Sequence, residues 1–286
     1  MAYIYMRYPG GLSKALTLSY DDGVETDIRF MSVIDKYNMK CTFNINTGLF
    51  APEGTVYPKS TVHRRMTKLQ AYEAYKNKPH EIAVHALTHP FLERMPLNIA
   101  SYEIAEDRKN IEEMFGFITR GCAYPYGTYS DEVVEILKNC GIVYARTTKA
   151  THNFDIPRDW LRLDPTCHHN DSNLTDLADK FIGDEIKDEA NPYFFYLWGH
   201  TYEFDGNDNW NVIEDFSAKV GGRDDVWYCT NIEAYDYIRA YNSIEFSNDC
   251  TIIHNPSATD VYLNVKVLGK LHKLCVKSGE TVNLRD

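Results

Sequence analysis

The stretch ALTLSYDDG at residues 15–23 gives the first indication of the fold. Its apolar part, Ala15 to Ser19, has the length and character of a buried strand, and it stops at Tyr20-Asp21-Asp22-Gly23. A helix pattern follows from Asp27 to Tyr37, with its apolar residues broadly on one face. Because a buried strand that leads into an amphipathic helix is typical of parallel sheets, this stretch favours an α/β fold.

The same alternation continues to about residue 241. We predict strands over residues 40–46, 81–84, 121–124, 142–147, 193–198 and 226–230, and helices over residues 98–115, 131–139, 174–186, 212–219 and 232–241. Residues 49–68 are predicted to form a loop, because Pro52, Gly54 and Pro58 interrupt them. After about Ser243, apolar and polar residues alternate with no helical period, which predicts a small antiparallel β appendage. The predicted organisation is a barrel over residues 1–242 and an appendage over residues 243–286.

The composition is that of a globular protein, and it excludes some classes of function. The chain has 286 residues, of which 44% are hydrophobic, so it can bury a large core without disulfides. The net charge of −11 argues against nucleic acid as a partner, since proteins that bind it carry basic surfaces. Seven singly scattered cysteines indicate reduced thiols.

The sequence contains no targeting or membrane signal that we can identify. No run of 18 apolar residues predicts a membrane span. The first residues lack the pattern of a secretory signal, so we expect a cytoplasmic protein, with a trimmed secreted chain as the alternative. The oligomeric state is not indicated by the sequence.

Polar residues stand out directly after several predicted strands. Asp21 and Asp22 follow the first strand, and His85, Tyr126 and His200 follow later ones. In a β/α barrel the carboxyl ends of all strands open onto one face, where active sites lie. We therefore expect these five residues to meet in one cleft.

The spacing of His85 and His89 indicates a metal site. Two imidazoles four residues apart, on a helical turn or a tight loop, can reach one ion. Zinc accepts two histidines and one carboxylate, and of the adjacent Asp21 and Asp22 one can bind the metal while the other stays free as a base. The alternatives are two unrelated surface histidines and an ordinary Asp-Asp-Gly turn. The expected cofactor is one divalent ion, Zn²⁺, with Co²⁺, Ni²⁺ or Fe²⁺ as alternatives.

Four motifs, in order along the chain, resemble those of a known family. Ser19-Tyr-Asp-Asp-Gly23 is similar to its first motif, T-F-D-D-G, and the stretch from His85 to His89 is similar to its second, H-[ST]-x-x-H, with Ala86 in place of Ser or Thr. Ala123-Tyr-Pro-Tyr-Gly127 resembles the third motif, R-x-P-Y-G, and Leu197-Trp-Gly-His200 resembles the fifth, L-x-x-H. The chain thus resembles the polysaccharide deacetylases, the carbohydrate esterases of family 4, which act on substrates such as chitooligosaccharides and peptidoglycan.

The resemblance implies a fold and a set of residue roles. The family fold is a distorted (β/α)7 barrel, which agrees with the predicted order of elements. By position in the motifs, the resemblance implies metal ligands Asp22, His85 and His89, a general base Asp21, an oxyanion contact from the backbone N–H of Tyr126, and a general acid His200.

The chain departs from the family in the third and fourth motifs. Ala123 stands where the family has an arginine that orients and tunes the base, and Arg146 and Arg162 are the candidates to replace it. No stretch matches the fourth motif, although residues 159–169 occupy its place. The residues that we expect to line the substrate site are Tyr124, Pro125, Trp160, Arg162, His168 and Trp198. For His168 and His169, an exposed loop pair is the alternative.

The strand-end residues and the resemblance together predict a metal-dependent hydrolase. It would remove N-acetyl groups from an amino-sugar oligo- or polysaccharide and release acetate, so an acetylated glycan is the expected partner. One alternative is hydrolysis of a non-sugar cyclic amide such as allantoin, for which the missing motif arginine leaves room. Another is a non-catalytic protein that binds carbohydrate without releasing acetate.

Overall fold

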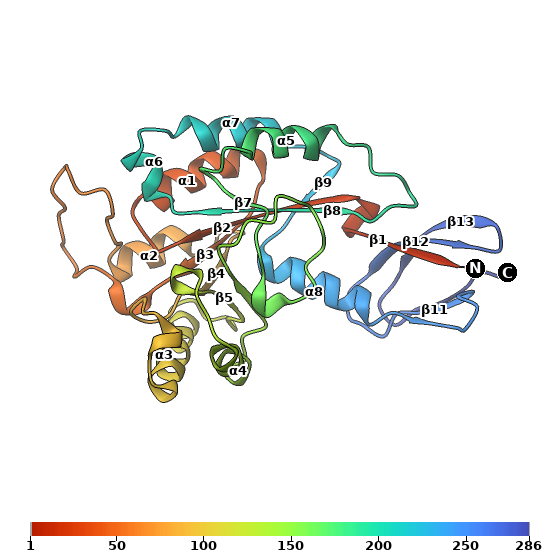
Figure 1. Cartoon of the computed structure of the whole chain (residues 1–286), viewed down its shortest axis with the longest axis horizontal. Coiled ribbons are helices and arrows are strands. Elements are labelled where there is room, and N and C mark those ends of the chain that lie inside the picture. The colour runs from red at the N-terminus through yellow and green to blue at the C-terminus, as the bar shows by residue number, and fades with distance from the viewer. Residues whose placement is uncertain (1, 286) are drawn as a thin grey trace.

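A curled parallel sheet forms the centre of the computed structural model, which describes residues 2–285 (Figure 1). Its strands are β2 (Lys14–Asp21), β3 (Cys41–Ile45), β4 (Glu81–Val84), β5 (Gly121–Ala123), β6 (Tyr144–Arg146), β7 (Cys167–His168), β8 (Tyr193–Gly199) and β9 (Val226–Tyr228). Seven of them follow the order β6-β5-β4-β3-β2-β8-β7, and β9 pairs with the first residues of β2. The α/β fold predicted from the sequence is confirmed.

One short segment, residues 163–168, connects the two edges of this sheet. Leu163 forms a parallel bridge with Arg146 at the end of β6, and its N–H donates to the carbonyl oxygen of Ala145 at 3.0 Å. Three residues later, the N–H of Thr166 donates to the carbonyl oxygen of Tyr196 in β8 at 2.8 Å. Because the chain passes from one edge to the other within a few residues, the sheet closes as a distorted barrel.

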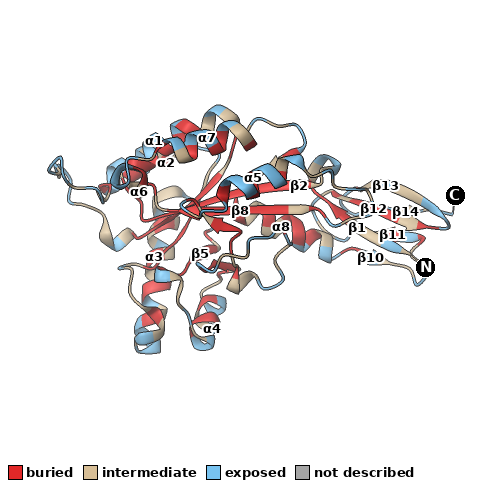
Figure 2. Cartoon of the chain, turned by 45° about the horizontal axis from the view of Figure 1, so that its top comes forward, coloured by how far each residue is buried: buried red, intermediate tan, exposed pale blue. Residues whose placement is uncertain are grey.

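The helices lie outside the sheet. They are α1 (Thr26–Ile34), α2 (Lys68–Tyr75), α3 (Leu97–Phe115), α4 (Asp131–Asn139), α5 (Leu174–Gly183), α6 (Tyr202–Gly206), α7 (Asn211–Val220) and α8 (Asn231–Asn242), with short 3₁₀ helices at Pro9–Gly11, Asp35–Tyr37, Thr47–Leu49, Leu92–Arg94, Pro125–Gly127 and Trp160–Arg162. In Figure 1, α1, α5, α6 and α7 cover one side of the sheet, and α3 and α4 cover the other. Figure 2 shows that the strands of the central sheet are largely buried, whereas the helices bury only one side.

Two helices, α2 and α6, were not predicted from the sequence. Of the residues of α2, only Ala71 and Tyr75 are buried, so this helix has no long apolar stripe to signal it. Its start is marked instead by a capping box, in which the side chains of Thr67 and Gln70 each accept a hydrogen bond from the other residue's backbone N–H. The predicted loop over residues 49–68 is confirmed as far as the cap residue Thr67, after which α2 begins.

The C-terminal residues form two small antiparallel sheets, as predicted. Their strands are β10 (Glu245–Phe246), β11 (Ile252–His254), β12 (Val261–Val267), β13 (Lys270–Val276) and β14 (Thr281–Asn283). The N-terminal strand β1 (Tyr3–Arg7) joins them, because it pairs with β12 along its whole length. The two ends of the chain therefore lie close together at the end of the molecule formed by the appendage (Figure 1). A domain boundary at residue 242 stays a prediction.

Two further features bear on the sequence analysis. All seven cysteines fall within the described part of the chain and are free thiols. Between residues 2 and 285, no helix combines the length and the apolar character that crossing a membrane requires.

The first turn of α8 fills the barrel at the end opposite the carboxyl ends of the strands. The buried side chain of Asn231 accepts a hydrogen bond from Thr17 Oγ1 at 2.8 Å and donates one to Tyr196 Oη at 2.7 Å. Its backbone N–H donates to Thr42 Oγ1 at 3.0 Å. Asn231 thus ties α8 to three strands, β2, β3 and β8, inside the barrel.

Replacing Asn231 tests this link. In Asn231→Ala the hydroxyls of Thr17 and Tyr196 lose a partner inside the barrel, and we expect the free energy of unfolding to fall by about 2 kcal/mol. Urea denaturation measures it. Asn242→Ala, at the exposed end of the same helix, is the control and should shift that free energy by no more than roughly 0.5 kcal/mol. Equal effects of the two substitutions would contradict the role of Asn231.

Candidate active site

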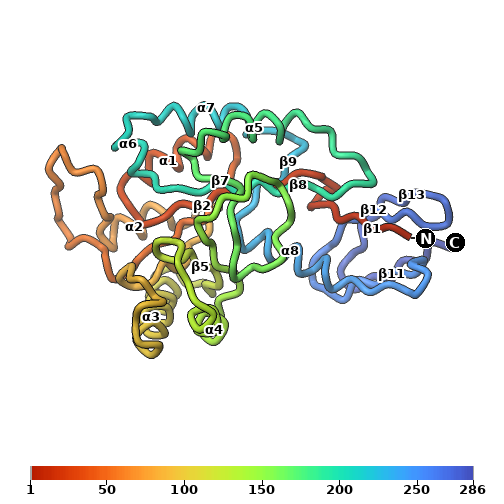
Figure 3. Tube along the Cα trace, viewed as in Figure 1, coloured from red at the N-terminus to blue at the C-terminus, as the bar shows by residue number. Residues whose placement is uncertain are grey.

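The residues that follow the strands meet at the end of the barrel that lies away from the appendage. Strands β2 and β8 run in that direction (Figure 1), and β3, β4, β5 and β6 are parallel to them. The carboxyl ends of these strands therefore form one rim. Figure 3 traces the chain through this rim, beside which a loop near residues 50–65, in orange, projects from the body of the molecule.

Asp22, His85 and His89 converge at this rim. One donor atom of each lies within 4.8 Å of the others. Asp22 Oδ1 is 3.9 Å from His85 Nε2 and 4.0 Å from His89 Nε2. Two imidazoles and one carboxylate are the donor set of many catalytic zinc sites, which keep a further position open. The structure thus brings the three predicted ligands together, while the binding of an ion stays a prediction.

The ring of His85 is held with one nitrogen free to bind. Its Nδ1 donates to the carbonyl oxygen of Ala123 at 2.8 Å, which fixes the proton on that nitrogen. Its Nε2 is buried and has no hydrogen-bond partner among residues 2–285. Burial lowers the pKa of His85 to about 4, so the ring is neutral and Nε2 has a lone pair. A buried, unprotonated and unpartnered nitrogen at this position fits a divalent cation.

The carboxylate of Asp22 is held by two residues of the projecting loop. Arg65 Nη2 lies 3.1 Å from Asp22 Oδ1, and His63 Nε2 lies 3.1 Å from Asp22 Oδ2. Arg65 Nη1 also donates to the backbone oxygen of Asp22 and, at 2.8 Å, to Asn46 Oδ1. Burial alone would raise the pKa of Asp22, but the hydrogen bond with His63 and the charge of Arg65 hold it well below its usual range. Asp22 is therefore an anion with a resident counter-cation.

Backbone conformation also sets this rim apart. Asp22, His89 and Tyr126 have φ values of 89°, 56° and 59°, in the left-handed region that residues other than glycine rarely adopt. Such conformations persist where the surrounding structure enforces them, and they cluster at functional sites.

Asp21 is buried beside Asp22 and is paired with Arg146. A guanidinium nitrogen of Arg146 donates to Asp21 Oδ2, and Asn44 Nδ2 donates to Asp21 Oδ1 at 2.8 Å. Burial raises the pKa of Asp21, but Arg146, together with His85 and His200, more than offsets this, so the pKa lies below its usual value. Arg146 is the register partner of Ala123 on the neighbouring strand. The cation missing from the third motif is thus supplied one strand away.

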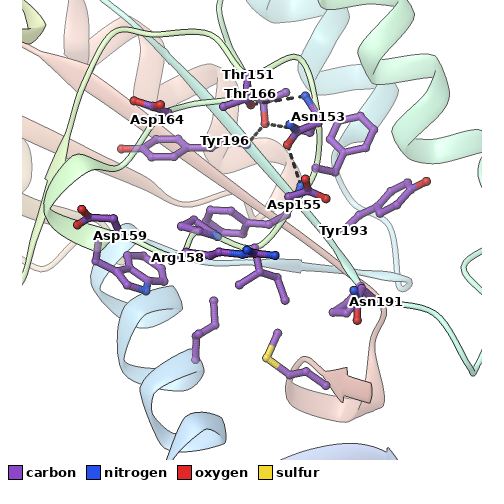
Figure 4. Close-up of a pocket in the computed structure, with 18 of the residues that line it drawn as sticks. Thr151, Asn153, Asp155, Arg158, Asp159, Asp164, Thr166, Asn191, Tyr193 and Tyr196 are labelled. Carbon is purple, nitrogen blue, oxygen red and sulfur yellow. Dashed lines mark hydrogen bonds between the residues drawn. The ribbon is translucent and has the colours of Figure 1, made fainter. Parts of the chain in front are cut away.

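Arg162, the other candidate for that role, does not contact Asp21. It pairs instead with Asp159 at 2.8 Å and with Asp131 at 2.6 Å, both on the surface. Arg162 and Trp160 line a separate cavity of about 770 Å³, formed by residues 151–166, the start of β8 and the end of α8 (Figure 4). Neither the metal-site residues nor Asp21 and His200 contribute to its lining.

His200 lies on the other side of Asp21. Its Nε2 is 3.8 Å from Asp21 Oδ2, and its Nδ1 is 3.3 Å from Glu203 Oε1. Burial lowers the pKa of His200, but Glu203 and Asp21 more than offset this, so the pKa lies above its usual value. A buried carboxylate and an imidazole with raised pKa therefore face each other beside Asp22, His85 and His89.

The remaining predicted substrate residues lie around the same rim. Tyr126 is exposed and stacks on Phe91, with ring centroids 3.9 Å apart, and it also contacts the ring of His89. Tyr124, Pro125 and Trp198 are buried. His168 contacts the ring of Trp198, and its centroid lies 6.2 Å from that of His200.

Several residues of the site were missed in the sequence analysis. Glu203 and Arg65 each contact a predicted functional residue, as described above. Asp107 of α3 accepts the backbone N–H of His85 at 3.1 Å and that of Thr47 at 2.8 Å, so it holds two loops of the rim. The position of Glu203 three residues after His200 was a usable signal, since residues at this spacing face each other on a helical turn. Arg65 and Asp107 had no such signal.

Replacing Arg65 should change the affinity of the metal triad. A guanidinium on Asp22 Oδ1 repels a divalent ion and competes for the same oxygen. Arg65→Gln keeps a hydrogen-bond donor but removes the charge, and we expect it to bind zinc roughly tenfold more tightly, a change of about 1.4 kcal/mol. Competition with a chromophoric chelator measures the dissociation constant.

Arg64→Gln is the matched control for this prediction. Arg64 pairs with Glu25 and Asp205, not with Asp22, so its loss removes the same charge from the same segment. Weaker binding in Arg65→Gln than in Arg64→Gln would mean that Arg65 organises the ligand rather than competing with the ion.

Similarity to solved structures is low. The chain is 21% identical to the deacetylase PplD of Streptococcus pyogenes, solved with acetate, over 51% of this chain and 61% of that one, with a TM-score of 0.43. It thus spans less than two thirds of that relative. A family 4 carbohydrate esterase from Streptomyces lividans, also solved with acetate, is 12% identical over 77% of this chain and 92% of that one, with a TM-score of 0.48. A family 4 pseudoenzyme from Bacillus anthracis is 15% identical over 80% and 67%, with a TM-score of 0.46.

Comparison with curated proteins found no match. The family profile described as polysaccharide deacetylase, in contrast, matches residues 7–145, nearly half of the chain. These residues run from the end of β1 into β6 and include the Asp-Asp pair, both histidines of the triad and the Pro-Tyr-Gly turn. Over residues 7–145, the chain therefore matches the polysaccharide deacetylase family.

Proposed function

We propose that this protein is a metal-dependent hydrolase that removes N-acetyl groups from an amino-sugar oligo- or polysaccharide and releases acetate. The observation that carries the proposal is the arrangement of Asp21 and His200. A buried carboxylate and an imidazole lie 3.8 Å apart, next to three converging metal donors. Hydrolysis of an amide needs a group that takes a proton from water and a group that gives one to the leaving amine.

Asp22, His85 and His89 would hold the ion. A divalent ion at that position would polarise the acetyl carbonyl and make water a better nucleophile near neutral pH. Zinc suits the donor set best, with cobalt, nickel and ferrous iron as further candidates.

Asp21 would be the general base. Its pairing with Arg146 keeps the carboxylate ionised, which is the form that accepts a proton. Asn44 fixes the other oxygen at 2.8 Å, so the carboxylate has one defined orientation. In the family that the chain resembles, an arginine at the position of Ala123 orients and tunes the base. Here Arg146 and Asn44 would take over that role for Asp21.

His200 would be the general acid, acting through Nε2. That nitrogen faces Asp21 and the metal triad, while Nδ1 faces Glu203. The raised pKa of His200 favours a protonated ring near neutral pH, which is the form that an acid requires. Tyr126 would add a backbone N–H to the oxyanion, and its exposed ring, stacked on Phe91, would offer a flat surface to a sugar.

The experiment is an acetate-release assay with purified, zinc-loaded protein and chitooligosaccharides. We expect acetate release, and we expect Asp21→Asn to lower kcat by roughly 100-fold or more, because the base is lost while the ligands remain. Zinc content, measured in the same samples, should be unchanged in Asp21→Asn. The Asp22→Asn variant is the complement and should lose both zinc and activity.

Two results would contradict the proposal. Ring opening of allantoin without acetate release from any acetylated sugar would support a cyclic-amide hydrolase. Sugar binding by zinc-loaded protein without acetate release would support a non-catalytic binding protein. Wild-type rates in Asp21→Asn would remove Asp21 from the mechanism.

A further inference from the structure

Three imidazoles surround the carboxylate of Glu203. His168 is the last residue of β7, His169 follows it, and His200 follows β8, while Glu203 lies in the first turn of α6. Glu203 Oε2 is 3.1 Å from both His168 Nε2 and His169 Nε2, and Oε1 is 3.3 Å from His200 Nδ1. Three of these side chains, those of His168, His200 and Glu203, place donor atoms within 4.8 Å of one another.

These close approaches leave polar atoms without hydrogen bonds. Within the described chain, His169 Nε2, His200 Nδ1 and Glu203 Oε2 are all buried and have no hydrogen-bond partner. His169 is the most telling, because its side chain is fully buried, its Nδ1 is also unpartnered, and its Nε2 points at the carboxylate. Buried polar atoms are almost always paired, so unpartnered atoms such as His169 Nδ1 and Nε2 point to a ligand at this cluster.

The spacing of the donors fits a transition-metal ion. Ligands bound at about 2.0–2.1 Å around a tetrahedral zinc ion lie roughly 3.3 Å from one another. The three contacts of Glu203, at 3.1, 3.1 and 3.3 Å, have this ligand-to-ligand spacing. Imidazole donors favour zinc, cobalt, nickel or copper over magnesium and calcium, which prefer oxygen.

The three histidines can bind a metal ion through the nitrogens that face Glu203 with the loss of only one hydrogen bond, between Asn170 and His168. His168 Nδ1 accepts the exposed backbone N–H of Asn170 at 3.1 Å, which places the proton of the neutral ring on Nε2. Binding through Nε2 moves that proton to Nδ1, and the amide of Asn170 then turns to water. His169 and His200 make no such bond through the nitrogens that face Glu203.

We propose that His168, His169, His200 and Glu203 form a second site for a transition-metal ion, distinct from the Asp22–His85–His89 triad. The two sites meet at His200, whose Nδ1 belongs to the second site and whose Nε2 faces Asp21. An ion on Nδ1 prevents His200 from becoming an imidazolium. Resting on the proposed function, this means that zinc in excess of the first equivalent inhibits acetate release.

The test is a zinc titration of chelator-treated protein, followed by calorimetry and by elemental analysis after gel filtration. The wild type should bind two equivalents. His168→Gln and Glu203→Gln should each bind one, with the second equivalent lost or weakened at least tenfold. His85→Gln should also bind one, because it retains the second site.

His152→Gln is the matched control. His152 also pairs with a carboxylate, Asp171, at 2.7 Å, but it belongs to neither cluster, so this variant should keep both equivalents. Circular dichroism shows whether each variant is folded. If His168→Gln is unfolded, Glu203→Gln tests the second site in its place.

The outcomes separate this inference from the proposed function. One equivalent in the wild type that is lost in His85→Gln and kept in His168→Gln would overturn the second site and leave the triad intact. One equivalent that is kept in His85→Gln and lost in His168→Gln would support the second site and overturn the triad. Binding of no zinc would overturn both.

Discussion

Two adjacent buried carboxylates impose the main constraint on this structure. Asp21 and Asp22 are both almost wholly removed from solvent at the end of β2, where like charges repel strongly and burial disfavours ionisation. Each is kept anionic by its own cation, Arg146 for Asp21 and Arg65 for Asp22. Arg146 comes from β6, at one edge of the sheet, and Arg65 comes from the projecting loop. The two pairs give two chemically identical groups different surroundings, and the proposed function assigns one of them as a base and the other as a ligand.

The arrangement of strands explains why so much of the rim could be predicted from the sequence. Asp21, Asp22, His85 and His200 each follow an apolar run, and in a parallel sheet such positions are forced to one edge. The short motifs around these residues then indicated which of them could bind a metal or transfer a proton. The elements that escaped prediction lack either signal: α2 has no apolar stripe, and β7 contains only Cys167 and His168.

Contacts between distant segments could not be predicted in the same way. Arg146 and Ala123 belong to different strands, and only the pairing register places the guanidinium where the motif arginine would be. Arg65 reaches Asp22 because Met66 donates its N–H to the backbone oxygen of Gly23, which aligns the loop with the end of β2. Sequence spacing carries no information about such register. The cluster of Glu203 and its three histidines is an intermediate case, because Glu203 and His200 are close in sequence, whereas His168 is distant from both.

The N-terminal strand has a consequence for how the chain is assembled. Tyr3 lies opposite Lys266, so β1 is synthesised more than 250 residues before the strand with which it pairs. All eight strands of the barrel are synthesised in the interval, and Met6 packs into the core between the barrel and α8. β1 therefore has no partner in this sheet until β12 has been made, and a nascent chain that stops before β12 leaves β1 unpaired there.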